Sequence, residues 1–163
     1  MVQKISLENT HQFSSFFLDY VSQNATLDLF YFAPPTIDGF RQKIGTSKYT
    51  AEQRQSLVKE LMHQYENSKI GEAVKSNIHA LEEENSYTVT TGHQLNIFTG
   101  PLYFIYKIAT TINLAKKLSQ EFPLQKFVPV YWMATEDHDF EEINNFILFG
   151  KTYTWTKIGR AHV

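Results

Sequence analysis

The sequence contains no cysteine, and this absence removes several kinds of chemistry from consideration. Without thiols there is no disulfide framework, no thiolate metal site and no cysteine nucleophile. No apolar run approaches the roughly 18 residues that a membrane-spanning helix requires. Residues 1–5 lack the apolar stretch of a signal peptide. Together these absences predict a cytoplasmic protein without a membrane partner.

The sequence also has little net charge and no block of charge of one sign. Its 15 basic and 17 acidic residues give a formal net charge of −2, and the basic residues are scattered. This balance provides no basic patch, so neither nucleic acid nor an acidic membrane surface is expected as a partner. The hydrophobic fraction of 42% and the aromatic fraction of 15% instead predict a globular protein with a substantial core.

Residues 1–85 are predicted to be helical. Thr50 followed by Gln53 has the pattern of a capping box, and we expect Leu57, Leu61 and Tyr65 to form the buried stripe of the helix that follows. The predicted helices are 6–20 with Ser6 as N-cap, 36–43, one that begins after Thr50, and 72–84, with a loop at 45–47. Two alternatives remain for this section: it packs on the rest of the chain, or it contributes to a homodimer.

Residues 86–157 carry strand and helix signals in alternation. A β-branched run at 87–91 and an apolar run at 127–133 predict two strands, with a helix from Pro101 to about Gln120 between them. This order predicts a parallel strand pair joined by a crossover helix that is covered by a further layer. Pro129 lacks a backbone donor and suggests a sheet edge. A helical turn at 140–144 and a hairpin of 146–149 with 152–156 follow. The expected fold class is α/β, with a helical amino-terminal section.

Polar residues follow both predicted strands at the point where each strand ends. The carboxyl ends of parallel strands meet at one edge of a sheet, which is where open α/β sheets bind ligands. We therefore expect two groups of residues to share one crevice. They are Gly92, His93, Gln94, Asn96, Thr99 and Gly100 in a loop at 92–100, and Glu136, Asp137, His138 and Asp139 after the second strand.

The first group suits an anionic ligand. Gly92 permits a positive φ or the close approach of a ligand to the backbone. The free N–H groups of the helix that Pro101 opens favour a phosphate or carboxylate. His93 is either an acid, base or anion-binding group, or a hydrogen-bonded turn histidine. Gln94 and Asn96 either orient ligand atoms or satisfy loop backbone groups. Lys107 is expected on a solvated helix face.

The second group places three carboxylates beside one imidazole. These side chains can hold a substrate ammonium or hydroxyl group, or they can accept the proton of an amine. The alternative is that Asp137 or Asp139 caps the helix that follows and the other carboxylates are solvated. No HExxH or similar spacing is present, so a metal site is not predicted.

Four segments together resemble the bacillithiol biosynthesis cysteine-adding enzyme family. They are Thr91-Gly92-His93-Gln94, Phe98-Thr99-Gly100-Pro101-Leu102-Tyr103, Tyr106-Lys107 and residues 136–144. Their order and spacing agree with the family, and the resemblance covers most of residues 1–157. His93 stands where many members carry Gln. The resemblance implies a Rossmann-like core related to nucleotidyltransferases, with a long coiled coil in the part of the protein that lies beyond this chain.

The resemblance also implies a function. It indicates a ligase that joins cysteine to glucosaminyl-malate. The activating cosubstrate is left open, and an ATP-dependent adenylate is chemically plausible. On this interpretation Glu136, Asp137 and His138 are catalytic. Gly92, His93, Gln94, Asn96, Thr99, Gly100 and Asp139 bind substrate, and no residue binds a metal. Three rival interpretations are a nucleotidyltransferase that acts on another small acid, a metal-dependent hydrolase, and an inactive truncated product.

The last six residues, 158–163, can be encoded by ATC GGA AGA GCA CAC GTC, which matches a widely used sequencing-library adapter. We therefore expect these residues to be an artefact, and the chain to be an amino-terminal fragment whose remainder is missing. The expected organisation is a helical section at 1–85, the first part of a Rossmann-like core at 86–157, and six foreign residues. Resequencing the source genomic DNA tests this expectation, which fails if an intact gene encodes all six.

Overall fold

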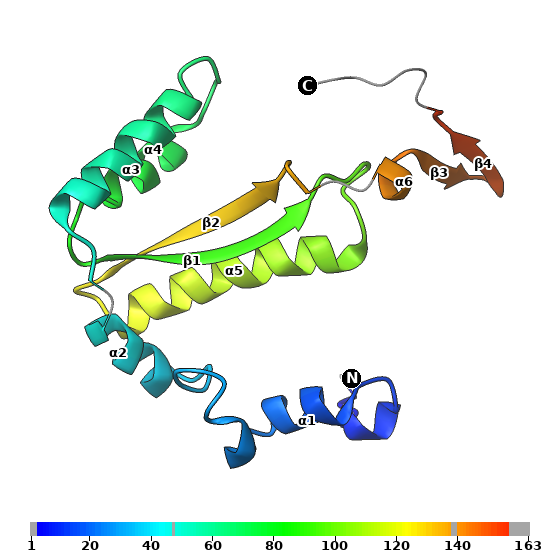
Figure 1. The fold of residues 1–163 in the computed structure, drawn as a ribbon, viewed down its shortest axis with the longest axis horizontal. Helices are drawn as coiled ribbons and strands as arrows, with labels where there is room; N and C mark the ends of the chain where they lie inside the picture. The colour runs from blue at the N-terminus through cyan, green and yellow to red at the C-terminus, as the bar shows by residue number, and fades with distance from the viewer. Residues whose placement is uncertain (1–2, 47, 138–139, 157–163) are drawn as a thin grey trace. The chain divides into compact units, whose positions relative to one another are not determined.

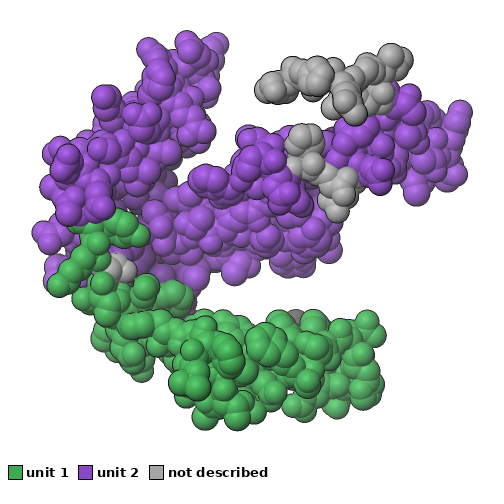
Figure 2. Space-filling model, viewed as in Figure 1, with its two compact units in different colours: residues 1–49 green, residues 50–163 purple. Residues whose placement is uncertain are grey.

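The computed structural model describes residues 3–46, 48–137 and 140–156 (Figure 1). The chain divides into two compact units, residues 1–49 and residues 50–163, which Figure 2 shows in green and purple. The second unit contains the strands, together with the two helices that directly precede the first strand. The division expected after residue 85 stays a prediction, and residues 158–163 lie outside the described part of the chain.

The first unit begins with short helical pieces rather than one long helix. They are the 3-10 turn η1 (Glu8–Thr10), helix α1 (Ser15–Val21) and the 3-10 turn η2 (Ala25–Leu27). The predicted helix from Ser6 to Tyr20 is therefore wrong in its first half. His11 adopts a left-handed φ of 53°, which ends η1, and the Ser14 side chain then accepts the N–H of Phe17 at 3.3 Å to begin α1.

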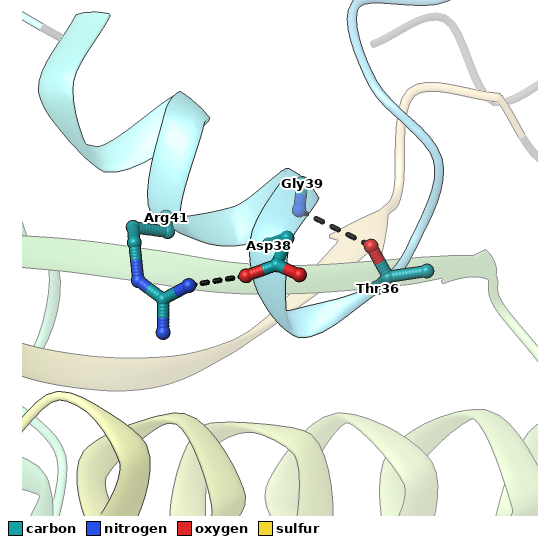
Figure 3. Close-up of polar contacts among 4 residues, drawn as sticks. All are labelled: Thr36, Asp38, Gly39 and Arg41. Atoms are coloured by element: carbon teal, nitrogen blue, oxygen red, sulfur yellow. Dashed lines mark hydrogen bonds and ion pairs between the residues drawn. The ribbon is translucent and has the colours of Figure 1, made fainter.

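Helix α2 (Ile37–Thr46) begins close to its predicted start but ends later. Thr36 caps it by accepting the N–H of Gly39 on its side-chain oxygen at 3.2 Å, and Arg41 forms an ion pair with Asp38 (Figure 3). Residues 45 and 46 are helical, so the predicted loop at 45–47 is wrong for these two, and Ser47 lies outside the described residues. A Cβ atom at Gly39 would lie 2.0 Å from the Pro34 carbonyl oxygen, so this position requires glycine.

The second unit opens with helices α3 (Ala51–Gln64) and α4 (Glu72–Ala80). The predicted capping box is confirmed: Thr50 accepts the N–H of Gln53 at 3.2 Å, and the Gln53 side chain accepts the N–H of Thr50 at 2.9 Å. Helix α4 begins at the predicted residue but ends at Ala80 instead of Glu84. The Arg54 guanidinium donates to the carbonyl oxygens of Leu81, Glu84 and Ser86, so it satisfies backbone acceptors between the end of α4 and the following strand.

The buried side of α3 is not the predicted one. Leu57 is 47% exposed, whereas Val58 is buried with Ile78 and Leu81 of the neighbouring helix segment. Leu61 does pack against this cluster. The predicted buried stripe is displaced by one residue, from Val58 to Leu57. The reason is that Arg54, one turn before Val58, is buried although it is charged.

A parallel strand pair forms the centre of the second unit. Strand β1 (Ser86–Gln94) pairs with β2 (Lys126–Ala134) in register from Ser86 opposite Lys126 to Gln94 opposite Ala134. Helix α5 (Leu102–Glu121) connects the strands and runs along them (Figure 1). The predicted strand–helix–strand order is confirmed. However, β1 continues through Gln94, so Gly92, His93 and Gln94 are strand residues and the predicted loop begins three residues too early.

The two faces of this strand pair are covered by different helices. Val128 packs in the cluster with α3 and α4, whereas Phe127 and Tyr131 lie against Phe122 and Phe104 at the two ends of α5, with ring centroids 6.1 Å and 5.5 Å apart. This alternation is the period of a strand. Leu102, Ile105 and Tyr106 of α5 are exposed. The further layer expected over α5 stays a prediction.

The carboxyl-terminal part of the described chain is a short helix and a hairpin. Helix α6 (Phe140–Ile143) precedes β3 (Asn145–Leu148) and β4 (Lys151–Thr154), which pair antiparallel. The predicted hairpin is confirmed with its turn one residue earlier. Phe149 and Gly150 have φ values of 50° and 73°, which fit the two central positions of a type I′ turn. Among the described residues, no helix is long and apolar enough to cross a membrane.

Candidate functional site

The structure brings the ends of β1 and β2 together at one pocket. Gln94 ends β1, and its side-chain Nε2 donates a hydrogen bond of 3.1 Å to Oδ2 of Asp137, which follows β2. The pocket has a volume of about 440 Å³, within the usual range for small-molecule sites. Its lining residues are Gly92, His93, Gln94, Tyr103, Lys107, Trp132, Ala134 and Asp137. We call this space the strand-end pocket.

Gly92 shapes the wall of the strand-end pocket. It lies opposite Trp132 in the sheet, and a Cβ atom there would lie 2.9 Å from the Trp132 carbonyl oxygen and 3.2 Å from its Cβ. Its φ is not left-handed. The positive φ considered for Gly92 is not adopted, and the group that approaches it is Trp132 of β2. Close approach of a ligand to Gly92 stays a prediction. The Trp132 side chain, which is 60% exposed, remains available to a ligand in the pocket.

His93 directs both ring nitrogens to protein atoms. Nδ1 lies 2.9 Å from the carbonyl oxygen of Gln94, and Nε2 lies 2.8 Å from the hydroxyl of Tyr103. A carbonyl oxygen only accepts, so Nδ1 carries the hydrogen, and in a neutral ring Nε2 accepts from Tyr103. This is the geometry of the hydrogen-bonded histidine considered from the sequence. An acid–base or anion-binding role for His93 stays a prediction.

Lys107 is the functional candidate that sequence reasoning missed. Lys107 is exposed, as expected of a solvated helix face, but its Nζ also donates a hydrogen bond of 2.6 Å to the Gly92 carbonyl oxygen, and the side chain lines the pocket. Tyr103, one turn earlier on α5, was also missed. The sequence did contain a signal for Lys107: it is a charged residue in the first half of α5, which is otherwise rich in apolar residues from Leu102 to Ile112.

Asn96, Thr99 and Gly100 do not line the strand-end pocket. Gly100 has a φ of 63° and donates its N–H to the Ile97 carbonyl oxygen at 2.9 Å, and a Cβ atom there would lie 2.8 Å from the Asn96 side chain. These residues form the turn that leads into α5. Pro101 is the N-cap residue of α5 and not part of its first turn. Substrate binding by Asn96, Thr99 or Gly100 stays a prediction.

The acidic segment is only partly described. Glu136 is exposed and lies outside the set of lining residues, whereas Asp137 is one of them. His138 and Asp139 lie outside the described residues, so their predicted roles are untested. The structure therefore brings together Gly92, His93, Gln94 and Asp137 out of the residues that the sequence predicted for one crevice.

A second, largely apolar pocket of about 550 Å³ lies between the 95–100 turn and the hairpin. Aromatic rings dominate its wall, with Phe98 and Phe146 in edge contact at a centroid distance of 5.1 Å. Its lining residues are Ile97, Phe98, Ile143, Asn144, Phe146, Tyr153, Thr154 and Trp155. No pattern in the sequence marked these residues as one surface, because they come from two segments whose contact depends on the hairpin.

Comparison with known proteins identifies the family. A family model described as "Bacillithiol biosynthesis BshC, N-terminal Rossmann-like domain" matches residues 1–163. The chain belongs to the BshC family. This membership confirms the resemblance found in the sequence and the Rossmann-like α/β fold, to which the parallel β1–β2 pair and the crossover helix α5 belong.

Similar, longer proteins carry the name "Putative cysteine ligase BshC". The protein from Christiangramia forsetii is 50% identical over 153 residues, which are 93% of this chain and 28% of the relative. The protein from Flavobacterium johnsoniae is 48% identical over 155 residues, which are 94% of this chain and 29% of the relative. A Bacillus cereus protein is 41% identical over 110 residues, 68% of this chain and 20% of the relative. The chain thus spans less than a third of the length of these BshC proteins.

Proposed function

We propose that the protein to which this domain belongs joins the carboxyl group of cysteine to the amine of glucosaminyl-malate, the last step of bacillithiol biosynthesis. The family description and the names of the relatives support a cysteine ligase. The observation that carries the proposal is the Gln94–Asp137 hydrogen bond, because it places a carboxylate in a pocket at the carboxyl ends of two parallel strands.

Amide formation requires a neutral amine as the nucleophile. The nitrogen attacks the carboxyl carbon, the leaving group departs from that carbon, and the nitrogen loses a proton. In the proposal the Asp137 carboxylate binds the amine and accepts this proton, helped by Glu136, His138 and Asp139 in the same segment. The donor bond from Gln94 orients the Asp137 carboxylate toward the pocket.

A free carboxylate is a poor electrophile, so the carboxyl group of cysteine must be activated. ATP supplies such activation by converting a carboxylate to an acyl adenylate or an acyl phosphate. The Lys107 ammonium group in the strand-end pocket suits a phosphate or carboxylate oxygen. We propose that the Gly92–Gln94 segment and the start of α5 hold the anionic group of the substrate beside it. A cytoplasmic location belongs to the same proposal, and a homodimer stays a prediction.

The full-length protein tests the proposal directly. It is incubated with cysteine and glucosaminyl-malate, with and without ATP, and bacillithiol is measured by mass spectrometry. Product that requires both substrates supports the ligase, and its dependence on ATP identifies the activator. Pyrophosphate release that does not need cysteine would instead favour a nucleotidyltransferase that acts on another small acid.

A further inference from the structure

The strand-end pocket is lined by charged side chains of opposite sign. Lys107 reaches it from α5, and Asp137 reaches it from the segment after β2. Gln94 lies on β1 and donates its side-chain amide to Asp137. A pocket wall with one cation and one anion is complementary to a ligand that carries both charges.

Lys107 has hydrogen-bonding capacity left for a ligand. Its Nζ donates to the Gly92 carbonyl oxygen at 2.6 Å, which fixes the ammonium group at the pocket wall. A lysine ammonium has three donors. In the described part of the chain, the ion pairs formed within 4.0 Å involve other lysines. The Lys107 side chain is exposed, so a ligand can reach the remaining donors.

The neighbouring groups do not offer an equivalent cation. The His93 ring nitrogens are directed to the Gln94 carbonyl oxygen and to the Tyr103 hydroxyl. The N-cap residue of α5 is Pro101, which makes no side-chain cap, and the residues of the turn before it do not line the pocket. Among the described lining residues, Lys107 is therefore the group best placed to bind an anion.

We propose that Lys107 binds a substrate carboxylate in the strand-end pocket and that Asp137 receives the ammonium group of the same ligand. This inference rests on the function proposed above, and it names the ligand class as a small molecule with a carboxylate and an amine. Both cysteine and glucosaminyl-malate have this chemistry. Lys107 thus adds a side-chain cation to the anion-binding role proposed for the Gly92–Gln94 segment and the start of α5. No bond forms or breaks in this binding step.

The test is isothermal titration calorimetry of the full-length protein with cysteine and with glucosaminyl-malate in separate titrations. The variants are Lys107→Met, which removes the charge, Lys107→Arg, which keeps it, and Lys117→Met as the matched control. Lys117 is exposed on the same helix and does not line the pocket. We expect Lys107→Met to weaken the Kd of one ligand at least about tenfold. Lys107→Arg should retain most of the affinity, and Lys117→Met should bind as the wild type does. The ligand that responds identifies the occupant.

Salt dependence separates a binding role from a structural role. Raising NaCl from about 50 mM to about 500 mM should weaken binding to the wild type and have less effect on Lys107→Met, because screening acts on the charge pair. A purely structural Lys107 would lower the melting temperature of the Met variant and leave the salt dependence of Kd unchanged.

Two results would overturn the inference: Lys107→Met binds both ligands with wild-type affinity, or the wild type binds neither. Bacillithiol formation by the wild type is measured separately. A wild type that forms product while Lys107→Met binds normally refutes only the role of Lys107. A wild type that forms no product but binds in a Lys107-dependent way refutes only the ligase.

Discussion

The side-chain amide of Gln94 donates a hydrogen bond of 3.1 Å to Oδ2 of Asp137, 43 residues further along the chain. Gln94 is the last residue of β1, and Asp137 follows the end of β2 at Ala134. The bond connects the two polar motifs of the sequence and orients the Asp137 carboxylate, and both residues line the strand-end pocket.

Gln94 and Asp137 should therefore act as a pair in catalysis. In the full-length protein we expect Gln94→Leu to lower bacillithiol formation about tenfold, because the Asp137 carboxylate loses the donor that orients it. Gln120→Leu, at an exposed position of α5, is the matched control and should retain wild-type activity. The Gln94→Leu/Asp137→Asn double variant should lose less than the product of the two single losses. Independent, multiplicative losses in this cycle would show that the two side chains do not cooperate.

Two glycines of α2 should respond to alanine in opposite directions. Gly39→Ala places a Cβ atom 2.0 Å from the Pro34 carbonyl oxygen, whereas a Cβ atom at Gly45 meets nothing within 4 Å. We expect Gly39→Ala to destabilise this unit by about 1–3 kcal/mol through overpacking. Gly45→Ala should be neutral or stabilise by up to about 1 kcal/mol, because alanine favours a helix. Amide hydrogen exchange of residues 37–46 in the full-length protein measures both effects. Equal protection in the two variants would contradict the packing around Gly39.

Arg54 should contribute strongly to the stability of the second unit. Its guanidinium is buried and donates to the carbonyl oxygens of Leu81, Glu84 and Ser86. Arg54→Met leaves these oxygens without their donor, and we expect a loss of about 2–4 kcal/mol in the local opening free energy of residues 78–90, measured by hydrogen exchange. Arg41→Met is the control, because the Arg41 side chain is 60% exposed and its surface ion pair should contribute about 0–1 kcal/mol. Similar losses in both variants would refute the capping role of Arg54.

Replacing Ser86 should raise the stability of the second unit, whereas Arg54→Met should lower it. Ser86 is 3% exposed, and its Oγ atom has no hydrogen-bond partner among the described residues. A buried hydroxyl without a partner carries an uncompensated desolvation cost, so Ser86→Ala should stabilise the start of β1 by up to about 1 kcal/mol. Amide hydrogen exchange of residues 86–90 in the full-length protein measures this gain in stability. A loss of protection at residues 86–90 would show that the hydroxyl does make a stabilising contact.

The sequence was sufficient for the features that depend on local patterns. The parallel pair followed from a β-branched run and an apolar run separated by a helix-length segment, and the capping box followed from Thr50 and Gln53. The hairpin followed from two short runs, with its turn one residue earlier than expected. The capping box and the hairpin are set by residues close together in the chain, whereas the pairing of β1 with β2 follows from the crossover connection between them. The expected position of Gln94 and Asp137 at one edge followed from the topology of parallel strands, and the structure places them in hydrogen-bond contact.

The features that failed depend on contacts that a single sequence does not display. The long helix from Ser6 is broken by a left-handed φ at His11, which no residue pattern marks. The buried stripe of α3 was shifted because Arg54 finds carbonyl partners 27 to 32 residues away and can therefore be buried. Lys107 is exposed as the sequence predicts, but its place in the strand-end pocket was not expected, because its acceptor, the Gly92 carbonyl oxygen, is a backbone atom of β1.

Asp137→Asn in the full-length protein is the decisive variant for the proposal that the strand-end pocket is the active site of a cysteine ligase. Bacillithiol formation from cysteine and glucosaminyl-malate is followed by mass spectrometry for this variant, for the wild type and for Glu121→Gln, an exposed carboxylate at the end of α5. We expect a fall of about 100-fold or more for Asp137→Asn with an unchanged melting temperature, and wild-type activity for Glu121→Gln. Wild-type product formation by a folded Asp137→Asn variant would show that the strand-end pocket is not the active site.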